Sequence, residues 1–206
     1  MTRLYAIVAA VVIFAMVGVL WFVTGGRGTD DVFAACRSSK IAGGAGAIGG
    51  PFTLVNTKGE TVTDRDVFTK PSIVYFGYTF CPDVCPLDSA RNAEAVDLLD
   101  EDGHDVTPVF ITIDPERDTP EVVGEFVDVM HEKMIGLTGT LEQTSAASKA
   151  YRTYYRKQDG DPEYYLVDHS TFSYLVLPEQ GFVEFFNRDT TPEEMAKTAE
   201  CFIDAS

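Results

Sequence analysis

The sequence has few of the groups that proteins use to bind transition metals. Its 206 residues include 4 cysteines and 3 histidines, so any site with soft or imidazole ligands draws on a small set of positions. A structural zinc site or an iron–sulfur cluster usually takes four protein ligands, often from two closely spaced cysteine pairs. Only one such pair is present, which disfavours both kinds of site.

Basic residues are scarce as well. The chain has 16 Lys and Arg against 32 Asp and Glu, a formal net charge of −16. A surface this acidic repels phosphate backbones and anionic lipid headgroups, so nucleic acid is not an expected partner. It would attract metal cations and basic protein surfaces, although acidity that serves only solubility explains the composition equally well.

Charged residues are missing altogether from residues 4–23. A helix of this length spans the roughly 30 Å hydrocarbon core of a bilayer. We therefore predict a transmembrane anchor over residues 1–24. The alternative is a cleaved signal peptide, whose apolar region is typically only about 7–15 residues long. The sparse flanking charges favour an N-terminus inside. The N-terminus lacks the Arg- and Ser-rich pattern of a mitochondrial transit peptide, which favours a single-pass protein of the inner (cytoplasmic) membrane with its globular domain in the periplasm.

A glycine-rich segment follows the apolar run. Eight of the 17 glycines lie within residues 25–50, a composition typical of a flexible tether, so we predict a globular domain over residues 51–206. Cys36 lies in the predicted tether and is interpreted as an unpaired thiol. Cys201 lies in a predicted amphipathic helix near the C-terminus and is interpreted as a core-packing residue.

The domain sequence alternates strand and helix patterns. Residues 52–63 predict a hairpin, residues 72–78 a fully buried strand at the centre of the sheet, residues 106–113 another strand, and residues 172–186 a second hairpin. Helices are predicted after the cysteine loop and after the capping residues Thr119, Thr140 and Thr191. Crossover helices followed by a terminal hairpin predict a mixed α/β sheet flanked by helices.

Cys81 and Cys85 lie in the loop that joins the buried strand to the first of these helices. Pro86 suits a first helical position, which would make Cys85 the N-cap and favour its thiolate form. Two thiolates at this spacing can converge on one soft ion, and two sulfurs with one imidazole suffice for Cu(I). A simple stabilising disulfide between the pair is the structural alternative.

The third ligand must come from one of three histidines. His104 and His131 lie in polar surroundings and are interpreted as solvated surface residues. His169 lies between Asp168 and Ser170 at the start of a hydrophobic strand, where a loop could bring it over the cysteines with Asp168 as its charge partner. A histidine with a purely structural role is the alternative.

Three motifs resemble those of the Sco/SenC family. They are Tyr-Phe-Gly-Tyr-Thr-Phe-Cys-Pro-Asp-Val-Cys-Pro at residues 75–86, Asp-Pro-Glu-Arg-Asp-Thr-Pro at 114–120 and Asp-His-Ser at 168–170. The resemblance runs from about residue 48 to the C-terminus. It implies a thioredoxin-like fold, copper bound by Cys81, Cys85 and His169, and a role in maturing the binuclear copper (CuA) centre of cytochrome c oxidase.

Two features of the motifs leave questions open. Residues 87–90 depart from the family, which often continues with threonines and a leucine, and this puts partner preference in doubt more than metal binding. The acidic loop over residues 114–118 fits a docking or redox-tuning role, and a solvated loop that caps the next helix explains it equally well.

Three functions are compatible with these observations. The first is a copper metallochaperone that carries Cu(I) or Cu(II) to the copper-bearing subunit of cytochrome c oxidase, and exchanges copper with other carriers. The second is a thiol-disulfide reductase that keeps the acceptor's cysteines reduced, with Cys81 as attacking thiolate and Cys85 as resolving thiol. The third is a copper or redox sensor, which the sequence neither supports nor excludes.

Overall fold

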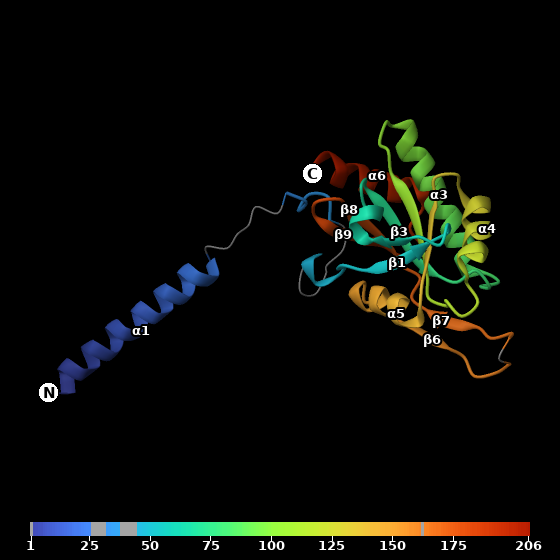
Figure 1. Ribbon diagram of the computed structural model, residues 1–206. Coiled ribbons are helices and arrows are strands. Elements are labelled where there is room, and N and C mark those ends of the chain that lie inside the picture. The colour runs from blue at the N-terminus through green and yellow to red at the C-terminus, as the bar shows by residue number, and fades with distance from the viewer. Residues whose placement is uncertain (1, 26–31, 38–44, 162) are drawn as a thin grey trace. The chain divides into compact units, whose positions relative to one another are not determined.

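The computed structural model describes residues 2–25, 32–37, 45–161 and 163–206 and divides the chain into two compact units, Met1–Ala35 and Cys36–Ser206. The first unit contains helix α1 (Thr2–Gly25), labelled in Figure 1. Among the residues that the structure describes, no helix is found with the length and apolarity needed to cross a membrane. The predicted anchor is therefore not shown.

The second unit is built on a seven-stranded mixed sheet in the order β2-β1-β5-β4-β3-β8-β9. Strands β3, β4 and β5 are parallel, and the other neighbours pair antiparallel. The strands are β1 (Thr53–Asn56), β2 (Thr61–Thr63), β3 (Ser72–Gly77), β4 (Thr107–Thr112), β5 (Ile135–Thr138), β8 (Ser173–Leu177) and β9 (Gly181–Phe186). The buried strand predicted over residues 72–78 is β3, but β4 holds the central position. Every residue of β3 is buried. Complete burial is typical of every inner strand of such a sheet, so it does not identify the middle strand.

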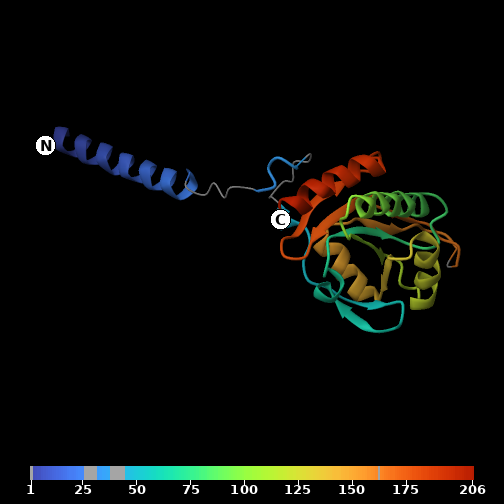
Figure 2. The same ribbon diagram turned by 90° about the horizontal axis from the view of Figure 1, so that it is seen from above.

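Helices cover both faces of the sheet. Figure 2 shows α3 (Val84–Glu101) and α6 (Pro192–Asp204) on one side and α5 (Leu141–Ala150) on the other. Helix α4 (Pro120–Met130) connects β4 to β5, and the short α2 (Asp64–Val67) and a 3₁₀ turn (Ala45–Ala47) complete the unit. The predicted caps are confirmed, since the side chains of Thr119, Thr140 and Thr191 each accept a hydrogen bond from their helix.

Aromatic side chains fill the core on both faces of the sheet. Phe110 packs between Tyr75 and Phe126, with ring centroids 6.4 Å and 4.7 Å away. Behind the sheet, Phe76 and Tyr151 have centroids 5.2 Å apart. Because successive strand residues point to opposite faces, Tyr75 and Phe76 contribute to different core layers, and Tyr75 lies on the layer that contains the cysteine helix.

Three strands were not predicted. Strand β5 has only four residues and contains Gly136, where a Cβ atom would lie 2.6 Å from Cγ1 of Val123 in α4. A short segment interrupted by glycine gives almost no period-two signal. The other two, β6 (Tyr155–Lys157) and β7 (Val167–His169), form a separate two-stranded antiparallel sheet.

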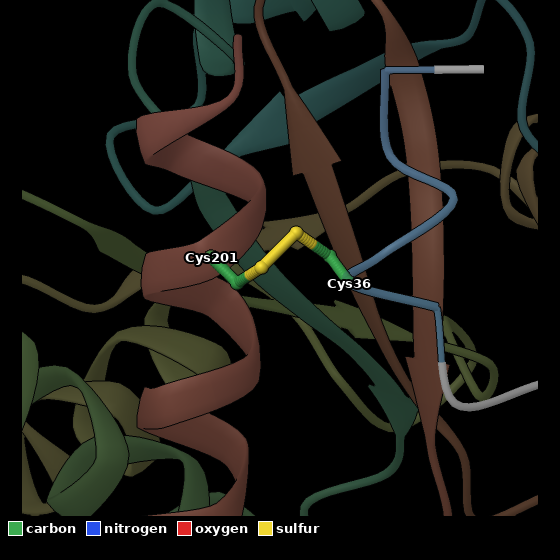
Figure 3. Close-up of a disulfide and its surroundings, with 2 residues drawn as sticks. All are labelled: Cys36 and Cys201. Carbon is green, nitrogen blue, oxygen red and sulfur yellow. A yellow bond between two sulfur atoms is a disulfide. The ribbon is translucent and has the colours of Figure 1, made fainter. Parts of the chain in front are cut away.

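A disulfide joins Cys36 to Cys201, so the interpretations of both residues were wrong. Figure 3 shows this bond between α6 and the segment around Cys36. Next to it, Nη1 of Arg37 donates a 2.8 Å hydrogen bond to the carbonyl oxygen of Val183. The backbone N–H of Gly49 similarly donates to Ala150 at 2.8 Å. The described residues 36–37 and 45–50 therefore belong to the folded unit.

Candidate metal centre

The cysteine loop connects the end of β3 to α3. The N-cap of α3 is Asp83, so Cys85 is the second helical residue rather than the predicted N-cap. Proline needs only a free first-turn position, and Pro86 meets this requirement at the third helical residue. In the first turn of α3, the backbone N–H of Cys85 has no partner within the helix. It donates instead to Sγ of Cys81, 3.3 Å away.

The two thiols therefore have opposite electrostatic environments. A hydrogen bond from the Cys85 thiol holds the pKa of Cys81 well below its usual range, and the amides of Asp83 and Cys85 act in the same direction. Complete burial raises the pKa of Cys85, and its bond to the Cys81 sulfur raises it further. The Cys85 thiol, together with the amides at the helix terminus, thus favours a thiolate at Cys81, whereas the sequence indicates a thiolate at Cys85.

The structure brings His169 to the two cysteines. Its Nε2 lies 3.3 Å from Sγ of Cys85, and the three candidate ligand atoms of Cys81, Cys85 and His169 all lie within 4.8 Å of one another. The other ring nitrogen, Nδ1, lies 2.8 Å from the carbonyl oxygen of Ser170. Because a carbonyl can only accept, Nδ1 carries the proton and the lone pair of Nε2 faces the sulfurs.

Asp168 does not orient His169, contrary to the prediction. Neighbouring residues of a strand point to opposite sides, and Asp168 faces away from the cysteines. It pairs with Nη2 of Arg156 at 3.0 Å and accepts a 2.6 Å hydrogen bond from Gln158. The orienting group is the backbone carbonyl of Ser170, which sequence motifs do not report.

Aromatic rings and a glycine shape the walls of the site. Tyr75 and Tyr78 meet the His169 ring edge to face, with centroids 6.3 Å and 5.7 Å away. A Cβ atom at Gly77 would lie 3.0 Å from Sγ of Cys85, so this glycine permits the close approach of strand and sulfur. These three residues belong to the first sequence motif, but only the two cysteines of that motif were chosen as functional.

Two carboxylates of the acidic loop after β4 are buried. Asp118 is fully buried and accepts hydrogen bonds from the N–H and hydroxyl of Thr79, at 3.1 Å and 2.6 Å, and from the hydroxyl of Thr112. Burial raises the pKa of Asp118, against the effect of these bonds. Asp114 is also buried. The solvated-loop interpretation is therefore wrong for these two residues, and Asp118 links Thr79, at the start of the cysteine loop, to Thr112 of β4.

The remaining histidines face carboxylates rather than solvent. Nε2 of His131 lies 3.1 Å from Asp97 of α3, and its side chain is mostly buried. Nε2 of His104 lies 3.9 Å from Glu200 and 3.8 Å from Asp204. The surface interpretation was therefore incomplete for both, since each faces a carboxylate of a packed helix. Neither belongs to the cysteine cluster.

The donor set of Cys81, Cys85 and His169 fits a soft metal ion. Two sulfurs and a neutral imidazole nitrogen match the preference of Cu(I) for soft ligands, and three donors leave it without the fourth protein ligand of structural zinc sites. A thiolate at Cys81 is already in the form that binds metals. Ligation by these three residues stays a prediction from their arrangement.

Comparison with known proteins gives consistent matches. The family model described as SCO1/SenC matches residues 41–204. Protein SenC of Rhodobacter capsulatus is 59% identical over 202 residues, which cover 97% of this chain and 90% of that protein. The mitochondrial SCO1 homolog 1 of Arabidopsis thaliana is 46% identical over 147 residues, 71% of this chain but 44% of that longer protein.

Solved structures agree with the sequence matches. The crystal structure of Arabidopsis thaliana ScoI with copper bound has a TM-score of 0.73 at 42% identity, and covers 77% of this chain and 99% of that one. Yeast Sco1 with copper bound also has a TM-score of 0.73, at 35% identity, covering 78% and 90% of the two chains. The predicted thioredoxin-like α/β fold, with a mixed sheet flanked by helices, is confirmed.

Proposed function

This chain belongs to the SCO1/SenC family, and we propose that it is a copper metallochaperone that delivers copper to the CuA centre of cytochrome c oxidase during assembly. The observation that carries the proposal is the 3.3 Å approach of His169 Nε2 to Sγ of Cys85, with the Cys81 sulfur in the same cluster. Copper is the cargo. Cys81, Cys85 and His169 would hold it, and the copper-bearing subunit of the oxidase would receive it.

Two further observations support copper as the cargo. Similar proteins from Arabidopsis thaliana and yeast have been solved with copper bound. The hydrogen bond between His169 Nδ1 and Ser170 leaves Nε2 as the donor atom and fixes the direction of its lone pair. A site with three ligands keeps an open side, which suits transfer by ligand exchange to a docked acceptor or to another copper carrier.

Copper binding is tested with the full chain in its reduced form. We expect His169→Ala and Cys81→Ala each to weaken Cu(I) binding, measured by competition with a chromophoric chelator, by about 10-fold or more. His131→Ala is the matched control, because His131 contacts Asp97 instead of the cysteines. X-ray absorption should count two sulfurs and one nitrogen at copper. Wild-type affinity in His169→Ala would refute the proposed ligand set.

Delivery needs its own test, because a bound ion shows only storage. The copper-loaded chain is mixed with the metal-free copper-bearing domain of the oxidase, and the optical bands of the binuclear centre are followed. Transfer should outpace that from a copper complex of a small thiol. Equal rates from both donors would leave no role for the chain as a chaperone.

A thiol-disulfide reductase is a second candidate, favoured by the asymmetry of the two thiols. The Cys81 thiolate would attack one sulfur of an acceptor disulfide and release the other as a thiolate. Cys85, after losing its proton, would then attack the Cys81 sulfur, break the mixed disulfide and release the second acceptor sulfur as a thiolate. The products are a Cys81–Cys85 disulfide and a reduced acceptor, with two electrons transferred. His169→Ala separates the candidates, since it should abolish copper delivery and leave disulfide reduction intact.

We also propose that residues 4–23 anchor the chain in the inner membrane and that the domain lies in the periplasm. The Cys36–Cys201 disulfide supports an oxidising compartment, because such bonds rarely persist in the cytosol. Fusion of a periplasm-dependent reporter enzyme after residue 206 tests the location, and alkaline extraction of membranes tests the anchor. An inactive reporter, or release of the chain by alkali, would contradict the corresponding part.

A further inference from the structure

The third ligand lies on an arm outside the main sheet. Strands β6 and β7 pair with each other, and His169 is opposite Tyr155 in their register. Neither strand pairs with the seven-stranded sheet in the described parts of the chain, and Figure 1 shows this hairpin beside α5. The backbone ladder that fixes β3, and with it the start of the cysteine loop, therefore does not fix His169. Its position depends on the short connection, residues 170–172, to Ser173, where β8 joins the main sheet, and on contacts between the hairpin and the domain.

Arg117 makes the most extensive of these contacts. Its Nε donates to Oδ2 of Asp114 at 2.6 Å, and its Nη1 donates to the carbonyl oxygen of Tyr165 at 3.0 Å. Tyr165 belongs to the β6–β7 hairpin, four residues before His169. Arg117 belongs to the same loop after β4 as Asp114, so one charge-assisted hydrogen bond, to Tyr165, joins the hairpin to the domain.

The same guanidinium also touches the cysteine loop. Its central carbon lies 3.6 Å from the ring centroid of Tyr165 and 4.8 Å from that of Phe80, the residue before Cys81. Its side chain is 13% exposed, so these contacts are screened little by water. A planar cation between a hairpin ring and a loop ring holds the two ligand-bearing segments in one arrangement.

Asp114 completes the contact. It accepts the hydroxyl hydrogen of Tyr165 at 2.6 Å while it pairs with Arg117, so the three groups form a closed set of hydrogen bonds. The next contact along β7 is the N–H of Val167, which donates to the hydroxyl of Tyr78 at 3.3 Å. None of Arg117, Asp114 and Tyr165 is among the clustered metal-ligand candidates, so the set can act on metal binding only by positioning the ligand-bearing segments. Its hydrogen bonds reach the hairpin that carries His169.

We propose that Arg117 is a positioning residue of the copper site, which holds the hairpin so that His169 reaches the two sulfurs. This inference rests on the proposed copper function. Arg117→Ala should free the hairpin and remove the imidazole from the metal in most molecules. By analogy with other groups that orient metal ligands, we expect Cu(I) affinity to fall about 10–100-fold.

A double-mutant cycle tests the inference in the full chain. If Arg117 acts through His169, Arg117→Ala should weaken Cu(I) binding in wild type and have no further effect in a His169→Ala background. X-ray absorption of the Arg117→Ala protein should show two sulfurs and a reduced nitrogen count. Arg156→Ala is the matched control on the same hairpin, because Arg156 pairs with Asp168 in solvent, and it should bind copper as wild type does.

A metal-free readout separates this inference from the proposed function. Hydrogen–deuterium exchange of residues 155–169 should quicken in Arg117→Ala and not in Arg156→Ala. Arg117→Lys keeps the charge beside Asp114 and so guards against a folding defect. Because lysine lacks the guanidinium group that reaches Tyr165, this variant should also show faster exchange, by a smaller factor than Arg117→Ala. Unchanged exchange, or equal losses of affinity with and without His169, would overturn the role of Arg117. An unaltered affinity in His169→Ala would instead overturn the ligand set.

Discussion

At the scale of single residues, the site depends on the hydrogen bonds that Cys85 donates to the sulfur of Cys81. The sulfur of Cys81 accepts hydrogen bonds from the backbone N–H and the thiol of Cys85. The sulfur of Cys85 is buried next to Gly77 and Tyr75. One sulfur is thereby prepared as a thiolate and the other kept as a thiol. The same arrangement suits the first step of metal capture and the first step of disulfide exchange.

The thiol asymmetry predicts a pH dependence of the reduced, metal-free chain. The folded-state pKa of Cys81 is lowered, so the stability it contributes is complete above the unfolded thiol pKa of about 8.5 and is lost as pH falls toward the folded value. The unfolding free energy of wild type minus that of Cys81→Ser should therefore grow from acid pH to about pH 8.5. Urea denaturation across this range measures it.

Spectroscopy provides the control for that prediction. At neutral pH the far-ultraviolet thiolate absorbance of the reduced chain should disappear in Cys81→Ser and persist in Cys85→Ser. The reverse pattern would assign the thiolate to Cys85 and contradict the electrostatic argument.

A buried carboxylate predicts a second effect at this scale. Asp118→Ala removes the acceptor for three hydrogen bonds from Thr79 and Thr112 and leaves buried donors unpaired. The free energy of unfolding should fall by about 1–3 kcal/mol in urea denaturation. Asp118→Asn keeps an acceptor of the same shape and should cost less. An equal loss in both variants would show that charge, rather than hydrogen bonding, matters at this position.

At the scale of elements, two glycines of α4 and β5 have opposite roles. Gly136 lets β5 pack closely under α4, where a Cβ atom would lie 2.6 Å from Val123 and 3.1 Å from Val127. Gly124, inside α4, would place its Cβ atom in ordinary contact, 3.6 Å from Thr57. Glycine at position 136 permits the close approach of β5 to α4. Glycine at position 124 has no such packing role and lowers the stability of α4, because glycine is unfavourable inside a helix.

The pair predicts opposite changes in stability from the same substitution. Gly136→Ala should lower the free energy of unfolding by about 1–3 kcal/mol through overpacking. Gly124→Ala should raise it by up to about 1 kcal/mol, because alanine favours helix. Thermal and urea unfolding of the two variants measure both effects. A destabilised Gly124→Ala would mean that α4 is packed more tightly than its distance to Thr57 indicates.

At the scale of the whole molecule, the Cys36–Cys201 disulfide closes a loop with a sequence separation of 165. It joins the start of the folded unit to the last helix, so nearly the entire unit lies within the loop. Such a bond reduces the freedom of the unfolded chain far more than a short-range one.

Removal of this bond should lower the free energy of unfolding by about 2–4 kcal/mol. Cys36→Ser, Cys201→Ser and the double variant should lose equal amounts, because either substitution breaks the same bond. Copper affinity should be unchanged, since neither cysteine is among the clustered ligand candidates. Additive losses in the double variant would show that the two residues stabilise the domain independently of the bond.

Local patterns in the sequence determined much of this structure. The capping threonines before α4, α5 and α6, the apolar run of β3 and the turn between β1 and β2 act over a few residues, so the sequence predicts them directly. The motifs that resemble the Sco/SenC family also identified the two sulfurs and the imidazole that the fold brings together.

Only the tertiary structure decided which distant groups meet. The pairing of Cys36 with Cys201, the orientation of His169 by Ser170 instead of Asp168, and the contact of Arg117 with Tyr165 all depend on the path of the chain between them. Sequence patterns report burial and backbone preference over a few residues. They carry no measure of distance through space, and the geometry of a three-ligand site is set by such distances.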